Sequence, residues 1–181
     1  MSLAARTARI AVSPTMKVAA DAMKLKAQGV DVVDFGAGEP DFPTPPHIAA
    51  AAHRAIDANF TKYTVNSGTE DLKRAIVERY KADNGVEYTT SEVIVSAGGK
   101  QALFNSVLSL FGAGDEVITH MPGWPTLVEQ IKLAEATPVI VRTHGEDGFR
   151  LRAEDVFDAF TPRTRGIILN SPDNPTGALI A

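Results

Sequence analysis

Short β-branched runs alternate with helix-forming segments through the second half of the chain, and this alternation constrains the fold most. Strands are predicted at 93–95, 115–119, 137–141 and 165–169, with helices from about 100 to 110, 126 to 134 and 152 to 160. A β-α-β-α order favours parallel strands joined by right-handed crossovers, with helices covering the faces of the sheet. The sequence therefore predicts a three-layer α/β/α fold with a mainly parallel sheet.

The first half of the chain predicts more helix and less sheet. A helix is expected from 15 to 28 and ended by Gly29, followed by a short apolar strand at 30–35. A Gly- and Pro-rich loop then spans 36–46, because such residues punctuate regular structure. Further helices are expected at 47–58 and 69–83, the second one stopped by Asn84-Gly85.

The turn between the strand at 93–95 and the next helix has the makings of an anion site. Gly98 and Gly99 precede the helix start, where backbone N–H groups are free and the helix dipole is positive. Lys100 beside them opposes that dipole unless an anion lies between, although a solvent-facing lysine is the alternative. Gln101 stands where a Walker A loop requires Ser or Thr. A phosphate cradle and a glycine-rich turn without a ligand both remain open on this stretch alone.

Two other loops follow predicted strands with unusual side chains. Trp124 is the only tryptophan and lies between Pro122-Gly123 and Pro125, where it could stack on a flat ligand or pack under its loop. Asn174 follows the strand at 165–169 and could donate from its amide or serve as a plain turn residue. Ligands of parallel sheets bind beyond the carboxyl ends of the strands. Together the three loops suit a flat, phosphorylated aromatic ring, and pyridoxal phosphate fits that description.

Composition excludes several classes of function. The 181 residues are 44% hydrophobic and 22% charged, with a net charge of -4 and interspersed Lys and Arg, so no nucleic-acid surface is indicated. No apolar run approaches the ~20 residues that span a bilayer. Cysteine is absent, and the four histidines lack metal-ligand spacing, so no metal site is predicted. A cytoplasmic protein is the default expectation.

Five motifs occur in an order that resembles one enzyme family. The chain is similar to the N-terminal part of fold-type-I pyridoxal-phosphate aminotransferases, in particular prokaryotic aspartate aminotransferases. The resemblance implies an N-terminal arm and part of the small domain at 1–45, and the first part of the cofactor-binding large domain at 46–181. The motifs are Gly-Ala-Gly-Glu-Pro-Asp-Phe (36–42), Lys-Tyr (62–63), Gly-Gly-Lys-Gln-Ala-Leu-Phe (98–104), Pro-Gly-Trp (122–124) and Asn-Ser-Pro-Asp-Asn-Pro-Thr-Gly (170–177).

The resemblance assigns cofactor-binding roles to matching positions. Backbone amides around Gly99, Lys100 and Gln101 would hold the phosphate of pyridoxal phosphate. Trp124 would stack on the pyridine ring, and Asn174 would donate to its 3′-oxygen. The reaction implied is transfer of an amino group between aspartate, or a similar amino acid, and a 2-oxoacid such as 2-oxoglutarate.

The same resemblance assigns substrate-binding roles. Gly38 would contact the substrate carboxylate through its backbone, and Asn174 and Trp124 would also border the substrate. Lys100 together with Thr15 would read the distal carboxylate of a dicarboxylate, for which a charged donor makes physical sense.

Two further expectations concern partners and completeness. Tyr63 would reach the phosphate of a neighbouring subunit, which implies a homodimer with shared sites. The family's Schiff-base lysine would lie beyond Ala181, so the chain is expected to be truncated and inactive alone. Gly123 replaces a usual tyrosine and is expected to loosen the loop that holds Trp124.

Two other functions stay open. One is an aminotransferase for other amino acids, such as alanine, aromatic or prephenate-type substrates. The other is a non-catalytic fragment that binds pyridoxal phosphate or only dimerises.

Overall fold

A computed structural model describes residues 3–11, 14–36 and 38–180, with residues 14 and 15 described by their backbone only. The chain divides into two compact units, residues 1–37 with 103–181 and residues 38–102. The elements are η1 (Ala5–Arg9), α1 (Pro14–Ala27), α2 (Pro46–Asp57), α3 (Glu70–Asn84), η2 (Thr90–Glu92), α4 (Gly99–Leu110), β1 (Glu116–Met121), α5 (Pro125–Leu133), β2 (Thr137–Arg142), η3 (Gly145–Asp147), α6 (Ala153–Asp158) and β3 (Thr164–Ile167). None of the helices in these ranges combines the length and the apolar character that a membrane-spanning segment needs.

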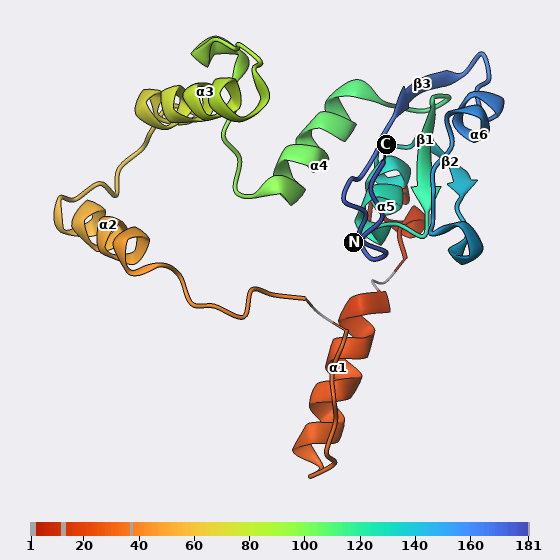
Figure 1. The fold of residues 1–181 in the computed structure, drawn as a ribbon, viewed down its shortest axis with the longest axis horizontal. Coiled ribbons are helices and arrows are strands. Elements are labelled where there is room, and N and C mark those ends of the chain that lie inside the picture. The colour runs from red at the N-terminus through yellow and green to blue at the C-terminus, as the bar shows by residue number, and fades with distance from the viewer. Residues whose placement is uncertain (1–2, 12–13, 37, 181) are drawn as a thin grey trace. The chain divides into compact units, whose positions relative to one another are not determined.

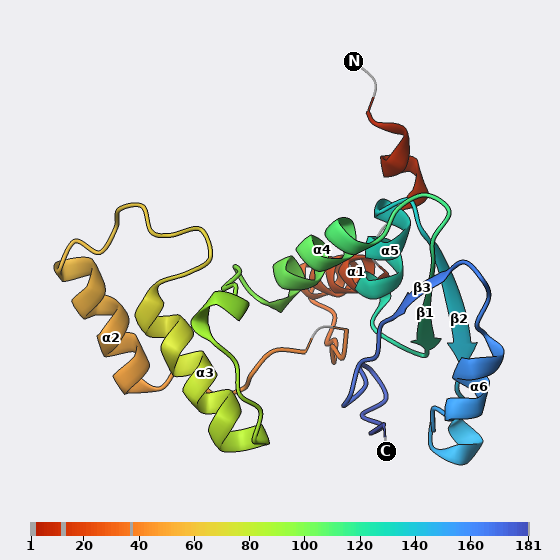
Figure 2. The same ribbon diagram turned by 90° about the horizontal axis from the view of Figure 1, so that it is seen from above.

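A parallel three-stranded sheet organises the first unit. Its strand order is β2-β1-β3, so β1 is the central strand (Figures 1 and 2). The pairing of β1 with β2 runs from Glu116 opposite Thr137 to Met121 opposite Arg142. The α/β class and the parallel sheet are therefore confirmed.

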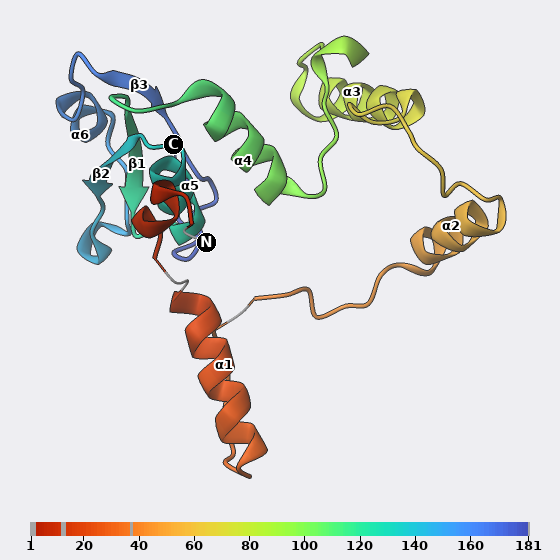
Figure 3. The ribbon, with the colours of Figure 1, turned by 180° about the vertical axis from the view of Figure 1, so that it is seen from behind.

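The core of this unit lies between β1 and α5. Val117 and Ile131 have no exposed surface and form a cluster with Ala136, against which Phe111 and Ile168 pack. Figure 3 shows α5 beside the strands. Burying an aliphatic side chain of this size stabilises a fold by about 1.5–3 kcal/mol. Successive side chains of a strand point to opposite faces, so Ile118 and His120 lie on the face of β1 that points away from Val117.

The side-chain carboxylate of Glu116, at the start of β1, accepts hydrogen bonds from two residues that precede the edge strand β3. Thr161 donates its hydroxyl to one oxygen of Glu116 at 2.5 Å, and Arg163 donates from Nε to the other at 2.9 Å. These donors favour the charged form, so the pKa of Glu116 lies below its usual value. The bonds tie the segment before β3 to the first residue of β1, next to the register shift between Glu116 and Val117 in the pairing of the two strands.

The second unit is built around α3 and the segment that follows it. Ion pairs join Glu70 to Lys73 at 3.2 Å and Asp83 to Arg79 at 2.6 Å along the helix surface. Gly85 ends α3 in the left-handed conformation, with φ of 67°, as the Asn84-Gly85 stop signal predicts.

Two of the expected strands do not form. Residues 30–35 and 93–95 form no strand, because no neighbouring strand among the described residues supplies a ladder of hydrogen bonds. The Val95 N–H, for example, donates to Ser67 O at 2.9 Å rather than to a strand. Helix α4 carries apolar residues almost all round, yet among its residues only Val107 is buried.

Candidate functional site

The predicted site residues fall in both units. Trp124 and Asn174 belong to the first unit, and Gly38 and Tyr63 to the second. The Gly99–Gln101 segment also belongs to the second unit. Thr15 lies in α1, and its side chain falls outside the described residues.

The start of α4 is an exposed turn with open space around its glycines. Gly98 adopts φ of +86°, a conformation that favours glycine, and α4 begins at the next residue. A Cβ added at Gly98 or Gly99 would meet no atom within 4 Å. A ligand can therefore approach the backbone here closely, at the positive end of a 12-residue helix.

The backbone N–H and the side-chain oxygen of Gln101 both form hydrogen bonds within the turn. Its backbone N–H donates to Gly98 O at 3.1 Å, and its side-chain oxygen accepts from the Ala97 N–H at 2.5 Å. These two bonds close the turn and hold it in shape. Gln101 therefore sets the conformation of the turn at the N-terminus of α4, where the Gly99 N–H group lies.

The loop after β1 folds tightly back onto the strand. A Cβ added at Gly123 would lie 2.5 Å from His120 O, a distance that no real Cβ tolerates. Gly123 is buried, and Trp124 beside it is half-buried at the start of α5. Glycine is required for a close backbone approach, so the structure does not support the expectation that Gly123 loosens this loop.

The turn after β3 is closed by its own aspartate. Oδ2 of Asp173 accepts hydrogen bonds from the Thr176 hydroxyl at 2.7 Å and from the Thr176 N–H at 3.3 Å. The Gly177 N–H donates to Asp173 O at 2.8 Å. Asn174 is exposed at the tip of this turn, and its backbone N–H donates to Asn170 Oδ1 at 3.2 Å. No hydrogen bond engages the Asn174 side-chain amide within the described residues.

A buried His–Asp pair links this turn to the central strand, and sequence reasoning missed it. His120 Nδ1 lies 3.9 Å from Asp173 Oδ1, and their side chains are 5% and 4% exposed. The Asn170 N–H donates to His120 Nε2 at 3.4 Å. The signal in the sequence is a histidine inside an apolar strand, at a position with no metal-ligand spacing.

The other predicted residues lie at the surface of the second unit. Tyr63 is fully exposed, with a relative accessibility of 106%. Gly38 is exposed as well, and an added Cβ there would meet nothing within 4 Å.

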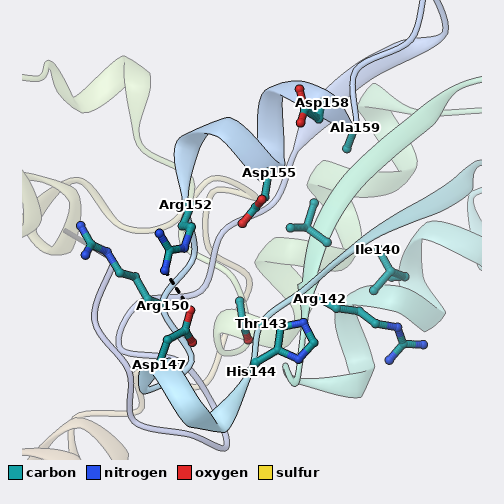
Figure 4. A pocket seen from close by; sticks show the side chains of 11 residues that line it. Ile140, Arg142, Thr143, His144, Asp147, Arg150, Arg152, Asp155, Asp158 and Ala159 are labelled. Carbon is teal, nitrogen blue, oxygen red and sulfur yellow. Dashed lines mark hydrogen bonds and ion pairs between the residues drawn. The ribbon is translucent and has the colours of Figure 1, made fainter.

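An open pocket of about 480 Å³ between β2 and α6 involves none of the predicted residues (Figure 4). It carries arginines and aspartates together, and Arg152 pairs with Asp147 at 3.4 Å. Arg142 and Arg150 extend in opposite directions in Figure 4, so their guanidinium groups do not converge. The mixed charge indicates no preference for a phosphate.

Residues 30–181 match the family described as "Aminotransferase class I and II". The chain is 49% identical over 171 residues to an aspartate/prephenate aminotransferase from Cereibacter sphaeroides, an alignment covering 94% of this chain and 43% of that protein. It is 44% identical over 175 residues to an aspartate aminotransferase from Rhizobium meliloti, covering 97% of this chain and 43% of the relative. The chain thus spans less than half the length of these relatives.

Solved structures agree with the sequence relatives. The aspartate aminotransferase of Thermus thermophilus with maleate superposes with a TM-score of 0.96 and is 42% identical, covering 100% of this chain and 47% of that one. An alanine aminotransferase from Pyrococcus furiosus superposes with a TM-score of 0.93 at 31% identity, and the match covers 99% of this chain and 46% of that one.

Proposed function

Because the chain belongs to the class I and II aminotransferases, we propose that it supplies the phosphate- and ring-binding part of a pyridoxal-phosphate-dependent aminotransferase. The start of α4 carries this proposal. There an exposed Gly98-Gly99 turn, with Gly98 at φ +86°, leaves the end of a helix open to an anion.

The residues present fit this cofactor chemically. The phosphate would lie against the Gly99 and Lys100 backbone, where an anion is favoured by the helix dipole. The half-buried indole of Trp124 would cover one face of the ring, and the Asn174 side-chain amide would donate to the 3′-oxygen. When bound, pyridoxal phosphate supplies the electron sink for moving an amino group between an amino acid and a 2-oxoacid.

We propose aspartate as the amino donor and a 2-oxoacid such as 2-oxoglutarate as the acceptor. The relatives named above support a dicarboxylate substrate, since the Thermus thermophilus structure was solved with maleate, itself a dicarboxylate. Lys100 is exposed beside the proposed phosphate site and would pair with the distal carboxylate, together with Thr15. Gly38 would approach the α-carboxylate through its backbone.

A second substrate range has its own support. The Cereibacter sphaeroides relative is named for both aspartate and prephenate, and prephenate also carries two carboxylates. Prephenate is therefore the first alternative acceptor to test, ahead of alanine or aromatic substrates.

We also propose that the active form is a homodimer. Tyr63 is fully exposed in a single chain, although a tyrosine ring usually buries much of its surface. A phosphate held by a second subunit would give its hydroxyl a partner.

A titration with 4-deoxypyridoxine 5′-phosphate tests the proposal, because this probe keeps the ring and phosphate but has no aldehyde to react with lysines. Trp124 is the only tryptophan, so quenching of its emission reports ring stacking directly. Saturable quenching is expected, with competition by inorganic phosphate. Absence of saturable binding would overturn the cofactor proposal.

The substrate proposal needs a separate measurement. With the probe bound, Lys100→Ala is expected to weaken maleate binding by about threefold to tenfold, the range of an exposed charge-assisted hydrogen bond. Lys24→Ala removes a cation from α1 that is also exposed, and it is the matched control. Equal maleate affinity in both variants would contradict the assignment of Lys100.

A further inference from the structure

We infer that His120 and Asp173 form a buried positioning pair that holds the 170–177 turn, and therefore Asn174, against the end of β1. This inference rests on the proposed function, because it explains how the amide donor for the ring oxygen is kept in place. In this proposal both residues act through Asn174 and Trp124 and not on the ligand itself.

The hydrogen-bond partners of His120 determine its tautomer. Nε2 accepts the Asn170 N–H at 3.4 Å, so this nitrogen must carry a lone pair rather than a proton. In the neutral ring the proton then sits on Nδ1, the nitrogen that faces Asp173 Oδ1 at 3.9 Å. The imidazole thus presents an acceptor to one end of the turn and a positive N–H to its middle.

The two side-chain oxygens of Asp173 have different roles. Oδ2 closes the turn by accepting both donors of Thr176. Oδ1 is buried and has no hydrogen-bond partner among the described residues, which is costly for a carboxylate. The Nδ1–H group of His120 is the positively polarised group that the structure brings beside it.

The link continues from His120 to the tip of the turn. Asn170 donates its N–H to His120 and accepts the Asn174 N–H on its side-chain oxygen at 3.2 Å. The carbonyl of His120 is also the atom that Gly123 approaches closely, next to Trp124. One residue of β1 therefore contacts both loops that carry the proposed ring-binding side chains.

The tautomer of His120 is directly measurable by long-range ¹H–¹⁵N NMR of the imidazole nitrogens. The Nδ1–H form is expected in the unliganded chain, whereas free histidine favours the Nε2–H form. Asp173→Asn keeps an oxygen for Thr176 but turns an NH₂ group toward Nδ1, so it should shift the proton to Nε2 and break the bond from Asn170. An Nε2–H form in the unmodified chain, or an unchanged tautomer in Asp173→Asn, would overturn the pair.

A second experiment separates positioning from simple stability. His120→Leu removes both contacts, whereas His120→Gln places an amide oxygen near the position of Nε2. We expect faster amide hydrogen exchange at Asn174 and about tenfold weaker 4-deoxypyridoxine 5′-phosphate binding in His120→Leu, within the coupling range of neighbouring residues. His120→Gln should restore most of the exchange protection at Asn174 and most of the probe affinity. Inorganic phosphate binding should stay unchanged in both variants.

Ile131→Val is the matched control, because it loosens the buried core without touching either loop. If Ile131→Val weakened the probe as much as His120→Leu did, the pair would be merely structural and the inference wrong. If the unmodified chain failed to bind the probe, the cofactor proposal would fail. The tautomer and the Asn174 exchange would then still decide whether the pair positions the turn.

Discussion

Adding one methyl group at Gly123 should destabilise the fold measurably. In Gly123→Ala the new Cβ would lie 2.5 Å from His120 O. Carbon–oxygen contacts of this kind settle near 3.3 Å, so roughly 0.8 Å must be absorbed by movement of the loop or of β1. The carbonyl belongs to the buried central strand, which has neighbours on both sides and cannot move freely.

Overpacking of this kind typically costs about 1–3 kcal/mol. For a chain of this length each kcal/mol lowers the melting temperature by about 2–4 °C, so a middle value of about 2 kcal/mol predicts a fall of roughly 4–8 °C. Differential scanning calorimetry measures the shift, and Trp124 emission reports whether the loop itself moves.

Gly112→Ala is the control for this experiment. Its Cβ would meet nothing within 4 Å, and Gly112 does not adopt a positive φ, so its melting temperature should stay level or rise slightly. Equal melting temperatures for Gly123→Ala and Gly112→Ala would refute the close-approach argument. The presence of glycine at 123, where the family usually has tyrosine, would then need another explanation.

Three other predictions concern the carboxylate at the base of the sheet and the proposed ligand site. Because Thr161 and Arg163 lower the pKa of Glu116, its contribution to stability is complete above the usual value of 4.5 and is lost as the pH falls through the lower folded-state pKa. Urea unfolding should therefore show Glu116→Gln less stable than the unmodified chain at pH 7, with a gap that narrows below about pH 4.5; a constant gap would contradict the pairing. Gly99→Ala should leave the melting temperature unchanged but weaken phosphate binding, measured calorimetrically, because its Cβ enters space open to a ligand. Mixed dimers of Tyr63→Phe and Gly99→Ala chains should regain one intact phosphate site if Tyr63 acts across the interface, and no regain would place it elsewhere.

Much of the fold could be predicted from local pattern. The β-branched runs at β1 and β2 are strands because they are flanked by turn residues and lie beside each other, and Gly85 ends α3 as its sequence predicts. The run at 93–95 is also β-branched but is not a strand, because a strand forms only where another strand completes its hydrogen bonds.

The candidate site was predictable to a similar extent. The Gly98-Gly99 turn at the start of α4 follows from local chemistry, and the structure shows it open. The roles of Trp124 and Asn174 stay predictions, because their convergence with that turn depends on the placement of the two units.

The sequence by itself determined which segments are helices and turns, where glycine is needed for backbone conformation, and which family motifs occur. Only the tertiary structure decided that Gly123 is needed for space rather than conformation, and that His120 meets Asp173. Helices, turns and glycine conformations depend on residues a few positions apart in the sequence. The contacts of Gly123 and the His120–Asp173 pair depend on which distant segments pack together. Packing at that level leaves no periodic trace in the chain, so a lone histidine in an apolar strand gave no sign of its partner.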